Sequence, residues 1–391
     1  MTPSARVAAA IECLDAILVG GAAEKVLTTW ARTHRFAGSK DRAAIRDHVF
    51  GALRCRRSYA AIGGAETGRG IMIGACLDTG GASDAWFDGK GYGAAILTQD
   101  EQDGTGTFAS QDRSVQMDVQ DWMVEQFDTS LGAQATDIAL KLRERAPVFV
   151  RVNLRLGTVD DAVVQLGLDD IEVVRHPDVA TALEVTKNPR RVQLSSAYLG
   201  GLIELQDAAS QAVVAAIPLP EQGRILDYCA GGGGKSLALA ALTKAEIFAH
   251  ESAPERMKDI WTRADRAGVN IANFDTNNAP QGADFNVVLC DAPCSGSGAW
   301  RRAPAGKWAF TPEDLSALCQ TQAGILDDAK KWVTPGGLLA YATCSLFAVE
   351  NADQVDAFLG KNPSWTCESQ IQFTPLDHGD GFFVALFRAP A

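Results

Sequence analysis

The chain has 391 residues, of which 47% are hydrophobic, and it carries a formal net charge of −12. This length allows two or three domains with separate cores, and the hydrophobic content argues against disorder over most of the chain. The acidic net charge argues against a generic nucleic-acid binder. Arg6, Glu12 and Asp15 interrupt the apolar start of the chain, and no apolar run approaches the length of a membrane span. We therefore expect a soluble cytoplasmic protein without a signal peptide or a membrane contact.

The first part of the chain, residues 1–145, has the pattern of helices. Apolar residues recur every three or four positions in 6–18 and in 39–54, and Ser39 stands where a helix N-cap is expected. The stretch 63–106 is rich in Gly and Asp, which predicts the longest loops of the chain there. The pattern predicts an all-α N-terminal domain.

Charge is distributed unevenly within this domain. Residues 25–57 contain nine Lys or Arg against two acids, a balance of +7, whereas residues 58–128 contain twelve acids against three bases, a balance of −9. A local basic face on an acidic protein fits docking to structured RNA. Solvated helix faces explain the same pattern equally well.

A domain boundary is expected at Ala146-Pro147. Short alternating strands follow at 148–153, 171–174 and 182–185, with helices between them as far as about residue 206. This predicts a small α+β module over residues 146–210.

The last part of the chain, residues 211–391, alternates strands and helices. Strands are expected at 224–229, 246–250, 284–290 and 337–342, and the last two are of the buried type. The last strand, 382–387, is expected at the edge of the sheet. The alternation predicts a Rossmann-like α/β domain with a doubly wound, mostly parallel sheet, which binds ligands at the carboxyl ends of its strands.

A glycine-rich turn follows the first strand of this domain. Glycine lets the backbone approach a ligand closely and leaves the helix N-terminus free to face it. A P-loop requires glycine five residues before Gly234, and Cys229 occupies that position, which disfavours an ATPase. Glu251 follows the second strand, where an acid holds the ribose of a dinucleotide. A site for S-adenosylmethionine (SAM) uses the same acid and a further one after the third strand, here Asp275. A tight turn that only packs a helix on the sheet is the third interpretation.

Two cysteines lie in polar turns at predicted strand ends. Cys294 belongs to Asp-Ala-Pro-Cys-Ser-Gly-Ser-Gly (291–298), and Cys344 belongs to Tyr-Ala-Thr-Cys-Ser (341–345). A lone cysteine there is usually a small buried hydrophobic residue, but two beside a cofactor turn indicate catalysis. Methyl transfer to carbon 5 of cytosine uses a thiolate, because its addition at carbon 6 makes carbon 5 nucleophilic. Asp291 is the candidate acid for N3 of the base.

The nine cysteines form no regular framework, and the sequence has no Cys-x-x-Cys pair. Reduced thiols are therefore expected, and neither a structural zinc site nor another metal site is predicted.

These motifs resemble the RNA cytosine-5 methyltransferases of the Nol/Nop/Sun type, and most of all the bacterial small-subunit ribosomal RNA methyltransferase B subgroup. The resemblance covers nearly the whole chain, and the two cysteine motifs are highly specific in combination. Residues 200–210, Arg301-Arg302 and Lys307-Trp308 match further stretches of that family. Residues 1–145 are similar to the antitermination-factor-like RNA-binding domain of the subgroup.

The resemblance implies that Cys344 is the nucleophile, that Cys294 assists product release, and that Asp291 and Lys235 complete the catalytic group. The SAM site would be lined by Cys229, Ala230, Gly231, Gly232, Gly233, Gly234, Lys235, Glu251, Asp275 and Asp291. The partner would be RNA, namely small-subunit (16S) ribosomal RNA, with the 146–210 module as a second RNA-binding part. We expect RNA contacts from Arg42, Arg46, Arg54, Arg56, Arg57, Arg301 and Arg302.

Three positions depart from the family pattern. Gly232 stands where the family has proline, Glu251 replaces the commoner aspartate, and Ala305-Gly306 lacks the expected acid. Two other classes stay open: a non-catalytic RNA-binding or ribosome assembly factor, and a nicotinamide-dependent oxidoreductase. Transfer RNA also stays open as the substrate, and a monomer is expected.

Overall fold

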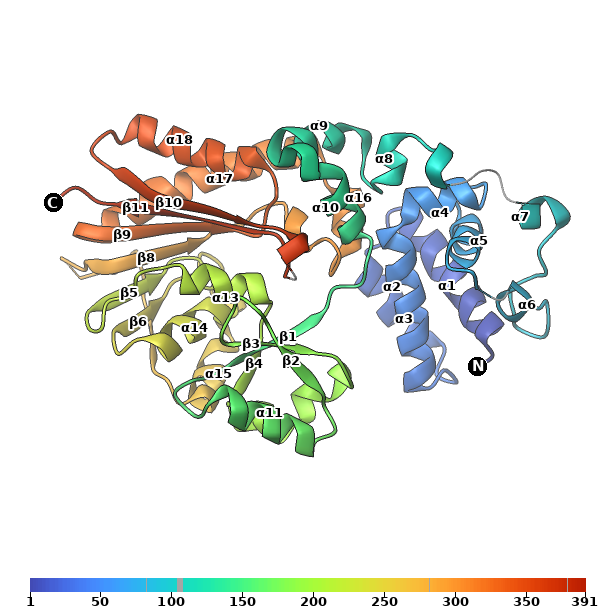
Figure 1. Ribbon diagram of the computed structural model, residues 1–391, viewed down its shortest axis with the longest axis horizontal. Helices are drawn as coiled ribbons and strands as arrows, with labels where there is room; N and C mark the ends of the chain where they lie inside the picture. Colours follow the sequence, from blue (N-terminus) through green and yellow to red (C-terminus); the bar gives the residue numbers. More distant parts are fainter. Residues whose placement is uncertain (82, 104–107, 281, 378) are drawn as a thin grey trace. The chain divides into compact units, whose positions relative to one another are not determined.

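The computed structural model describes residues 1–81, 83–103, 108–280, 282–377 and 379–391. It divides into two compact units, one formed by Met1–Arg145 with Trp300–Phe310 and the other by Ala146–Ala299 with Thr311–Ala391. The first unit is helical and the second contains the sheets (Figure 1). Among the described residues, no helix combines the length and the apolar character needed to cross a membrane.

The helical unit has a hydrophobic core to which α1, α2, α3 and α5 contribute most of the buried side chains. Its helices are α1 (Pro3–Leu18), α2 (Ala23–Thr33), α3 (Ser39–Arg54), α4 (Arg56–Ile62), α5 (Gly68–Asp78), α6 (Ser83–Trp86), α7 (Gln99–Asp103), α8 (Arg113–Gln116), α9 (Asp121–Leu131), α10 (Ala135–Leu142) and α16 (Pro304–Ala309).

Helix α5 lies within residues 63–106, the stretch that is expected to hold the longest loops of the chain and whose residues 104–106 are outside the described part. Its side chains Ile71, Met72 and Ile73 are each 1% exposed, so this helix lies inside the core. The glycines that suggested a loop serve close packing instead, because a Cβ at Gly74 would lie 1.9 Å from the carbonyl oxygen of Tyr59 in α4.

The segment Trp300–Phe310, which follows the Cys294 turn in sequence, belongs to the helical unit. The Trp308 Nε1 donates a hydrogen bond of 2.7 Å to the Leu53 carbonyl oxygen. Lys307 Nζ donates one of 3.1 Å to the carbonyl oxygen of Arg54, and burial lowers the pKa of Lys307 to about 8. The sequence pattern did not predict this assignment, since α16 lies between two elements of the second unit.

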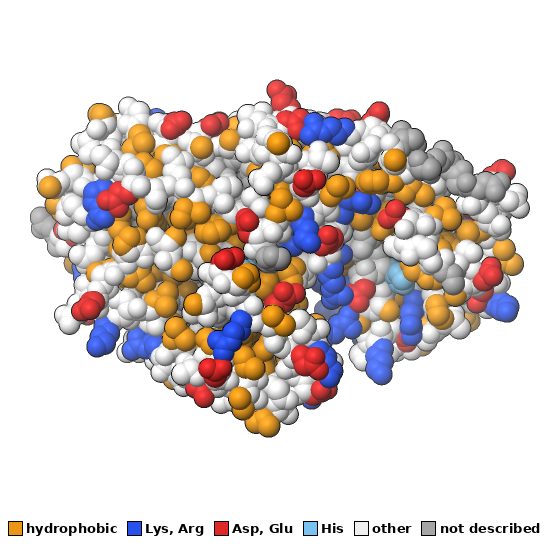
Figure 2. All heavy atoms as spheres, in the orientation of Figure 1, with side chains coloured by type: hydrophobic (Ala, Val, Ile, Leu, Met, Phe, Trp, Pro, Cys, Tyr) orange, Lys and Arg blue, Asp and Glu red, His pale blue; other side chains and the backbone are white. Residues whose placement is uncertain are grey.

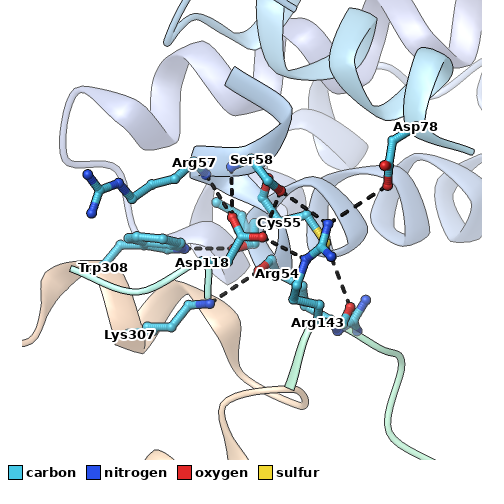
Figure 3. A network of polar contacts seen from close by, with 10 residues as sticks. Arg54, Cys55, Arg57, Ser58, Asp78, Asp118, Arg143, Lys307 and Trp308 are labelled. Atoms are coloured by element: carbon cyan, nitrogen blue, oxygen red, sulfur yellow. Dashed lines mark hydrogen bonds and ion pairs between the residues drawn. The ribbon is translucent and has the colours of Figure 1, made fainter. Parts of the chain in front are cut away.

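A buried carboxylate, Asp118, organises the interior of the helical unit (Figure 3). Asp118 accepts hydrogen bonds from the backbone amides of Arg57 (3.0 Å) and Ser58 (2.9 Å) and from the Ser58 hydroxyl (2.7 Å). Its Oδ2 also lies 2.7 Å from Nε of Arg143. Burial raises the pKa of Asp118, so these donors stabilise a charge that its surroundings disfavour. Asp118 thereby fixes the start of α4 to the end of α10.

Asp118→Asn is expected to lower the free energy of unfolding by about 3 kcal/mol, because it leaves the Arg143 guanidinium without its buried counter-charge. Asparagine tolerates the left-handed backbone at this position (φ 51°), so the change removes the charge and one acceptor oxygen without straining the backbone. Urea denaturation measures the difference. Asp128→Asn, which breaks an exposed pair with Arg113, is the control and should leave stability unchanged. Equal stability of the two variants would contradict this role of Asp118.

The second unit begins with a four-stranded antiparallel sheet in the order β2-β3-β1-β4. Its strands are β1 (Val148–Val152), β2 (Val173–Arg175), β3 (Ala182–Val185) and β4 (Ile203–Leu205). Helices α11 (Val159–Leu168) and α12 (Ser196–Leu199) close its core. Strand β4 is an addition to the strands expected from the sequence.

A seven-stranded sheet in the order β10-β11-β9-β8-β5-β6-β7 forms the rest of the second unit. Its strands are β5 (Arg224–Asp227), β6 (Glu246–Ala249), β7 (Ile271–Asn273), β8 (Phe285–Asp291), β9 (Val333–Thr343), β10 (Thr366–Phe373) and β11 (Phe382–Arg388). The pairs among β5 to β9 are parallel, and β11 runs antiparallel to both of its neighbours. This is the doubly wound, mostly parallel sheet that the sequence predicted.

Helices cover both faces of this sheet (Figure 1). One face packs against α13 (Ala208–Ala215), α14 (Gly234–Leu242) and α15 (Ile260–Ala267), and the other against α17 (Pro312–Ala329) and α18 (Ala352–Lys361).

The expectation that residues 382–387 form the edge strand is wrong. Strand β11 is buried along its length and lies between β9 and β10. The edge is β10, whose polar sequence Thr-Cys-Glu-Ser-Gln-Ile-Gln-Phe has exposed positions and gave no strong strand signal.

Candidate functional site

A cavity of about 640 Å³ lies at the carboxyl ends of β5, β6, β8 and β9. It brings together most of the site residues expected from the sequence: Cys229, Ala230, Gly231, Gly232, Gly234, Lys235, Glu251, Asp291, Cys294 and Cys344. These residues come from four separate segments, which the parallel sheet places at one edge.

The glycine turn between β5 and α14 leaves backbone facing this cavity. Gly231 (φ 50°) and Gly233 (φ 79°) have left-handed conformations that favour glycine. At Gly233 a Cβ would also lie 2.3 Å from Cγ1 of Ile260, so this residue is required by packing as well as by conformation. Gly233 itself lies behind the turn rather than among the lining residues. Gly232 has no such constraint.

Glu251 follows β6 and is held rigidly. One of its carboxylate oxygens accepts a hydrogen bond of 3.0 Å from the Gly231 amide, and the other accepts one of 3.2 Å from the Ala253 amide. Arg256 lies 3.2 Å away and partly balances its charge. A fixed carboxylate beside a glycine turn is suited to binding the hydroxyls of a ribose.

Lys235, the second residue of α14, reaches the end of β8. Its Nζ lies 2.7 Å from Oδ2 of Asp291 and 4.9 Å from the ring centre of Phe382. Lys235 is 7% exposed, whereas the Asp291 side chain is 33% exposed. The buried ammonium therefore fixes one carboxylate oxygen of Asp291 and leaves the group open to the cavity.

The two thiols meet because β8 and β9 are neighbouring parallel strands. In this pairing Asp291 lies opposite Ala342. Cys294 follows Asp291 by three residues and Cys344 follows Ala342 by two, so both cysteines lie just beyond the paired strand ends. Their sulfur atoms lie 3.3 Å apart. The hydrogen bond to Cys344 and burial together raise the pKa of Cys294 well above its usual value, so Cys294 is held protonated beside Cys344. All nine cysteines, each of them described, are free thiols.

Glu350, which the sequence did not single out, connects the two cysteine turns. Its carboxylate is 0% exposed and accepts hydrogen bonds from the Ser295 amide (2.8 Å) and the Ser345 hydroxyl (2.5 Å). Gln322 in α17 donates a further bond of 3.0 Å. Ser295 and Ser345 each directly follow one of the two cysteines, so Glu350 fixes both turns at once.

Asp275 has a different position from the other predicted cofactor residues. It follows β7, is exposed, and accepts hydrogen bonds from the Asn277 amide (2.9 Å) and the Asn278 side chain (2.6 Å). These bonds lower the pKa of Asp275, with the largest contribution from Asn278. Asp275 does not appear among the described residues that line the cavity, and its contact with a cofactor stays a prediction.

One buried residue of the α+β module, Arg151, supports the glycine turn. Arg151 in β1 donates hydrogen bonds from Nη1 to the Gly234 carbonyl oxygen (2.9 Å) and to Oε1 of Gln206. Burial lowers the pKa of Arg151 to about 10. An arginine inside the predicted strand 148–153 was the available signal, since buried charges usually have a structural reason.

Asp227 at the end of β5 lies under the cavity and is fully buried. It accepts a hydrogen bond of 2.6 Å from the Ser236 hydroxyl, and its Oδ1 has no hydrogen-bond partner among the described residues. Burial raises the pKa of Asp227 to about 7. An acid within an otherwise apolar strand was the signal in the sequence.

The free energy of unfolding should therefore fall as the pH rises from about 4 to about 7, because the folded state holds a proton on Asp227 that the unfolded state has released. In Asp227→Asn the side chain is neutral at every pH, so the free energy of unfolding of this variant should fall less over the same pH range. Urea midpoints of both proteins at about pH 5 and about pH 7.5 measure the difference. If the urea midpoints of the two proteins differ by the same amount at both pH values, the raised pKa of Asp227 is refuted.

The arginines expected to contact RNA are largely engaged within the helical unit. Arg54 donates from Nε to the Arg301 carbonyl oxygen (2.6 Å), Arg56 pairs with Glu66 (2.7 Å), and Arg57 pairs with Asp121 (2.6 Å). Arg301 is 1% exposed and Arg302 is exposed. Arg42 and Arg46 line a groove between α2 and α3. The contacts of all seven with RNA stay predictions.

Known proteins resemble this chain over most of its length. Residues 214–388 match the family model described as 16S rRNA methyltransferase RsmB/F, and residues 120–193 match an RsmF/B-like ferredoxin-like domain. The ribosomal RNA small subunit methyltransferase B of Klebsiella pneumoniae is 31% identical over 281 residues. That alignment covers 68% of this chain and 64% of the relative, a little under two thirds of its length.

Solved structures share the fold. The crystal structure of PH0851 superposes with a TM-score of 0.76 at 22% identity and covers 99% of both chains. The structure of NSun6 from Pyrococcus horikoshii with SFG has a TM-score of 0.61 at 19% identity and covers 70% of this chain and 98% of the other.

Proposed function

The chain belongs to the RsmB/F methyltransferase family through residues 214–388, and on this basis we propose that it is an enzyme that forms 5-methylcytosine in RNA with SAM as methyl donor. The observation that carries the proposal is the pair of thiols 3.3 Å apart beside a glycine turn with a fixed acid. Neither a nicotinamide-dependent oxidoreductase nor a non-catalytic RNA-binding factor requires two adjacent thiols at this position.

The cavity residues fit SAM. The Gly231 to Gly234 backbone and the α14 N-terminus suit the carboxylate end of the cofactor, and Glu251 suits its ribose. The same fold accommodates SFG, an analogue of SAM, in the NSun6 structure. When bound, SAM supplies an electrophilic methyl group next to the thiols.

The side chains then have separate tasks. Cys344 adds as a thiolate to carbon 6 of cytosine, which makes carbon 5 nucleophilic toward the methyl group. Asp291, oriented by Lys235, shares a proton with N3 of the base, and this partial positive charge on the ring favours the addition. After methyl transfer the proton on carbon 5 is released to solvent, its bonding electrons re-form the carbon 5–carbon 6 double bond as the carbon 6–sulfur bond breaks, and Cys344 departs as a thiolate.

The hydrogen bond between the thiols supports this division of roles. The raised pKa of Cys294 holds a proton on its sulfur atom, which lies 3.3 Å from the sulfur atom of Cys344. A proton on Cys294 can stabilise the departing thiolate of Cys344 when the product is released. Small-subunit ribosomal RNA is the substrate we propose, by analogy with the relative from Klebsiella pneumoniae.

Cys344→Ala should reduce methyl transfer from labelled SAM to small-subunit ribosomal RNA by at least about 10³-fold, because the covalent step is lost. SAM binding, measured by calorimetry, should stay unchanged because this thiol is not a cofactor ligand. Cys367→Ala in β10 is the matched control and should keep full activity. Undiminished turnover of Cys344→Ala would remove it as the nucleophile.

A further inference from the structure

A groove of about 790 Å³ on the helical unit lies between α2 and α3. Four arginines and one aromatic residue line it: Trp30, Arg32, Arg35, Arg42 and Arg46. The space-filling view shows Lys and Arg side chains gathered over these two helices (Figure 2). The chemistry of the cavity at the sheet edge does not involve this groove.

Some arginines of the basic run at residues 25–57 have no acidic partner, and these line the groove. Arg46 is paired through both terminal nitrogens with Glu24 (2.5 and 2.6 Å). The side chains of Arg32 and Arg35 are exposed, and neither forms an ion pair or a hydrogen bond within the described part of the chain. Arg42 uses only Nε, which donates to the Ala37 carbonyl oxygen at 2.9 Å. Three guanidinium groups are therefore available to an anion here, whereas Arg54, Arg56 and Arg57 are engaged.

Stacked aromatic rings extend from the groove to its rim. The rings of Trp30 and His34 stack at 4.3 Å with an interplanar angle of 11°, and His34 meets Phe36 edge to face at 5.7 Å. Phe36 is 74% exposed, although it is a large apolar ring. It directly follows Arg35, so a flat hydrophobic surface lies next to free positive charge.

We propose that this groove binds an unpaired segment of RNA, with Arg32, Arg35 and Arg42 on its phosphates and Phe36 against one unstacked base. Guanidinium groups bind phosphate oxygens in pairs, and single-stranded RNA is recognised by stacking on exposed aromatic rings. A duplex hides its base faces, and an acidic peptide offers carboxylates but no base to stack on Phe36. The inference rests on the proposed RNA substrate and locates part of its binding outside the catalytic cavity.

Fluorescence anisotropy of the full chain with a short labelled oligoribonucleotide, single-stranded or as a duplex, tests this. Arg32→Ala with Arg35→Ala should weaken single-strand binding roughly tenfold and reduce the salt slope by about 1.4, as expected for two lost phosphate contacts. Arg113→Ala with Lys331→Ala is the control, since it removes the same charge from exposed ion pairs. Phe36→Ala should weaken single-strand binding roughly tenfold and leave the salt slope unchanged.

Each result decides a separate point. If wild type binds the single strand and the arginine variant behaves as its charge control, the groove is refuted and the proposed RNA substrate stands. If Phe36→Ala has no effect, or the duplex binds as tightly as the single strand, the base contact is refuted. If the wild-type chain binds neither probe and methylates no RNA, the proposed function fails as well.

Discussion

One buried carboxylate, Glu350, keeps the two reactive turns in a fixed relation. It accepts from the Ser295 amide and the Ser345 hydroxyl, and each of these residues directly follows a cysteine. The strand register brings the two turns to the same edge, but register alone leaves freedom in the residues beyond the strands. Thiol chemistry at a flat base requires positions held to within about half an ångström, which the shared hydrogen bonds of Glu350 provide.

The cofactor side of the cavity is held in a similar way by groups outside the glycine turn. Arg151 in the α+β module bonds to the Gly234 carbonyl oxygen, Glu251 bonds to the Gly231 amide, and Ile260 leaves no room for a side chain at Gly233. The turn is therefore preformed, so that a ligand would not bear the entropic cost of ordering it. The position of Lys235 in α14 then links this turn directly to Asp291 on β8.

The sequence predicted the sheet and most of the cavity because strand periodicity, glycine turns and polar strand ends are local signals. It misjudged α5, where glycines serve close helix packing, and β11, whose place inside the sheet depends on the polar strand β10. It also missed Glu350 and the membership of Trp300–Phe310 in the helical unit. These depend on contacts between residues far apart in the chain, which no local pattern records. Likewise, charge counts found the basic run but not which arginines are already paired.

The central claim is that Cys344 bonds covalently to cytosine and that Cys294 is needed for release. The most direct measurement is a denaturing gel of Cys294→Ala expressed in bacterial cells, with and without ribonuclease. The account predicts a retarded, ribonuclease-sensitive band that disappears when Cys344 is also replaced by Ala. If the wild-type chain methylates the RNA of those cells and Cys294→Ala gives no retarded band, or gives one that persists without Cys344, the assigned roles of the two thiols are wrong.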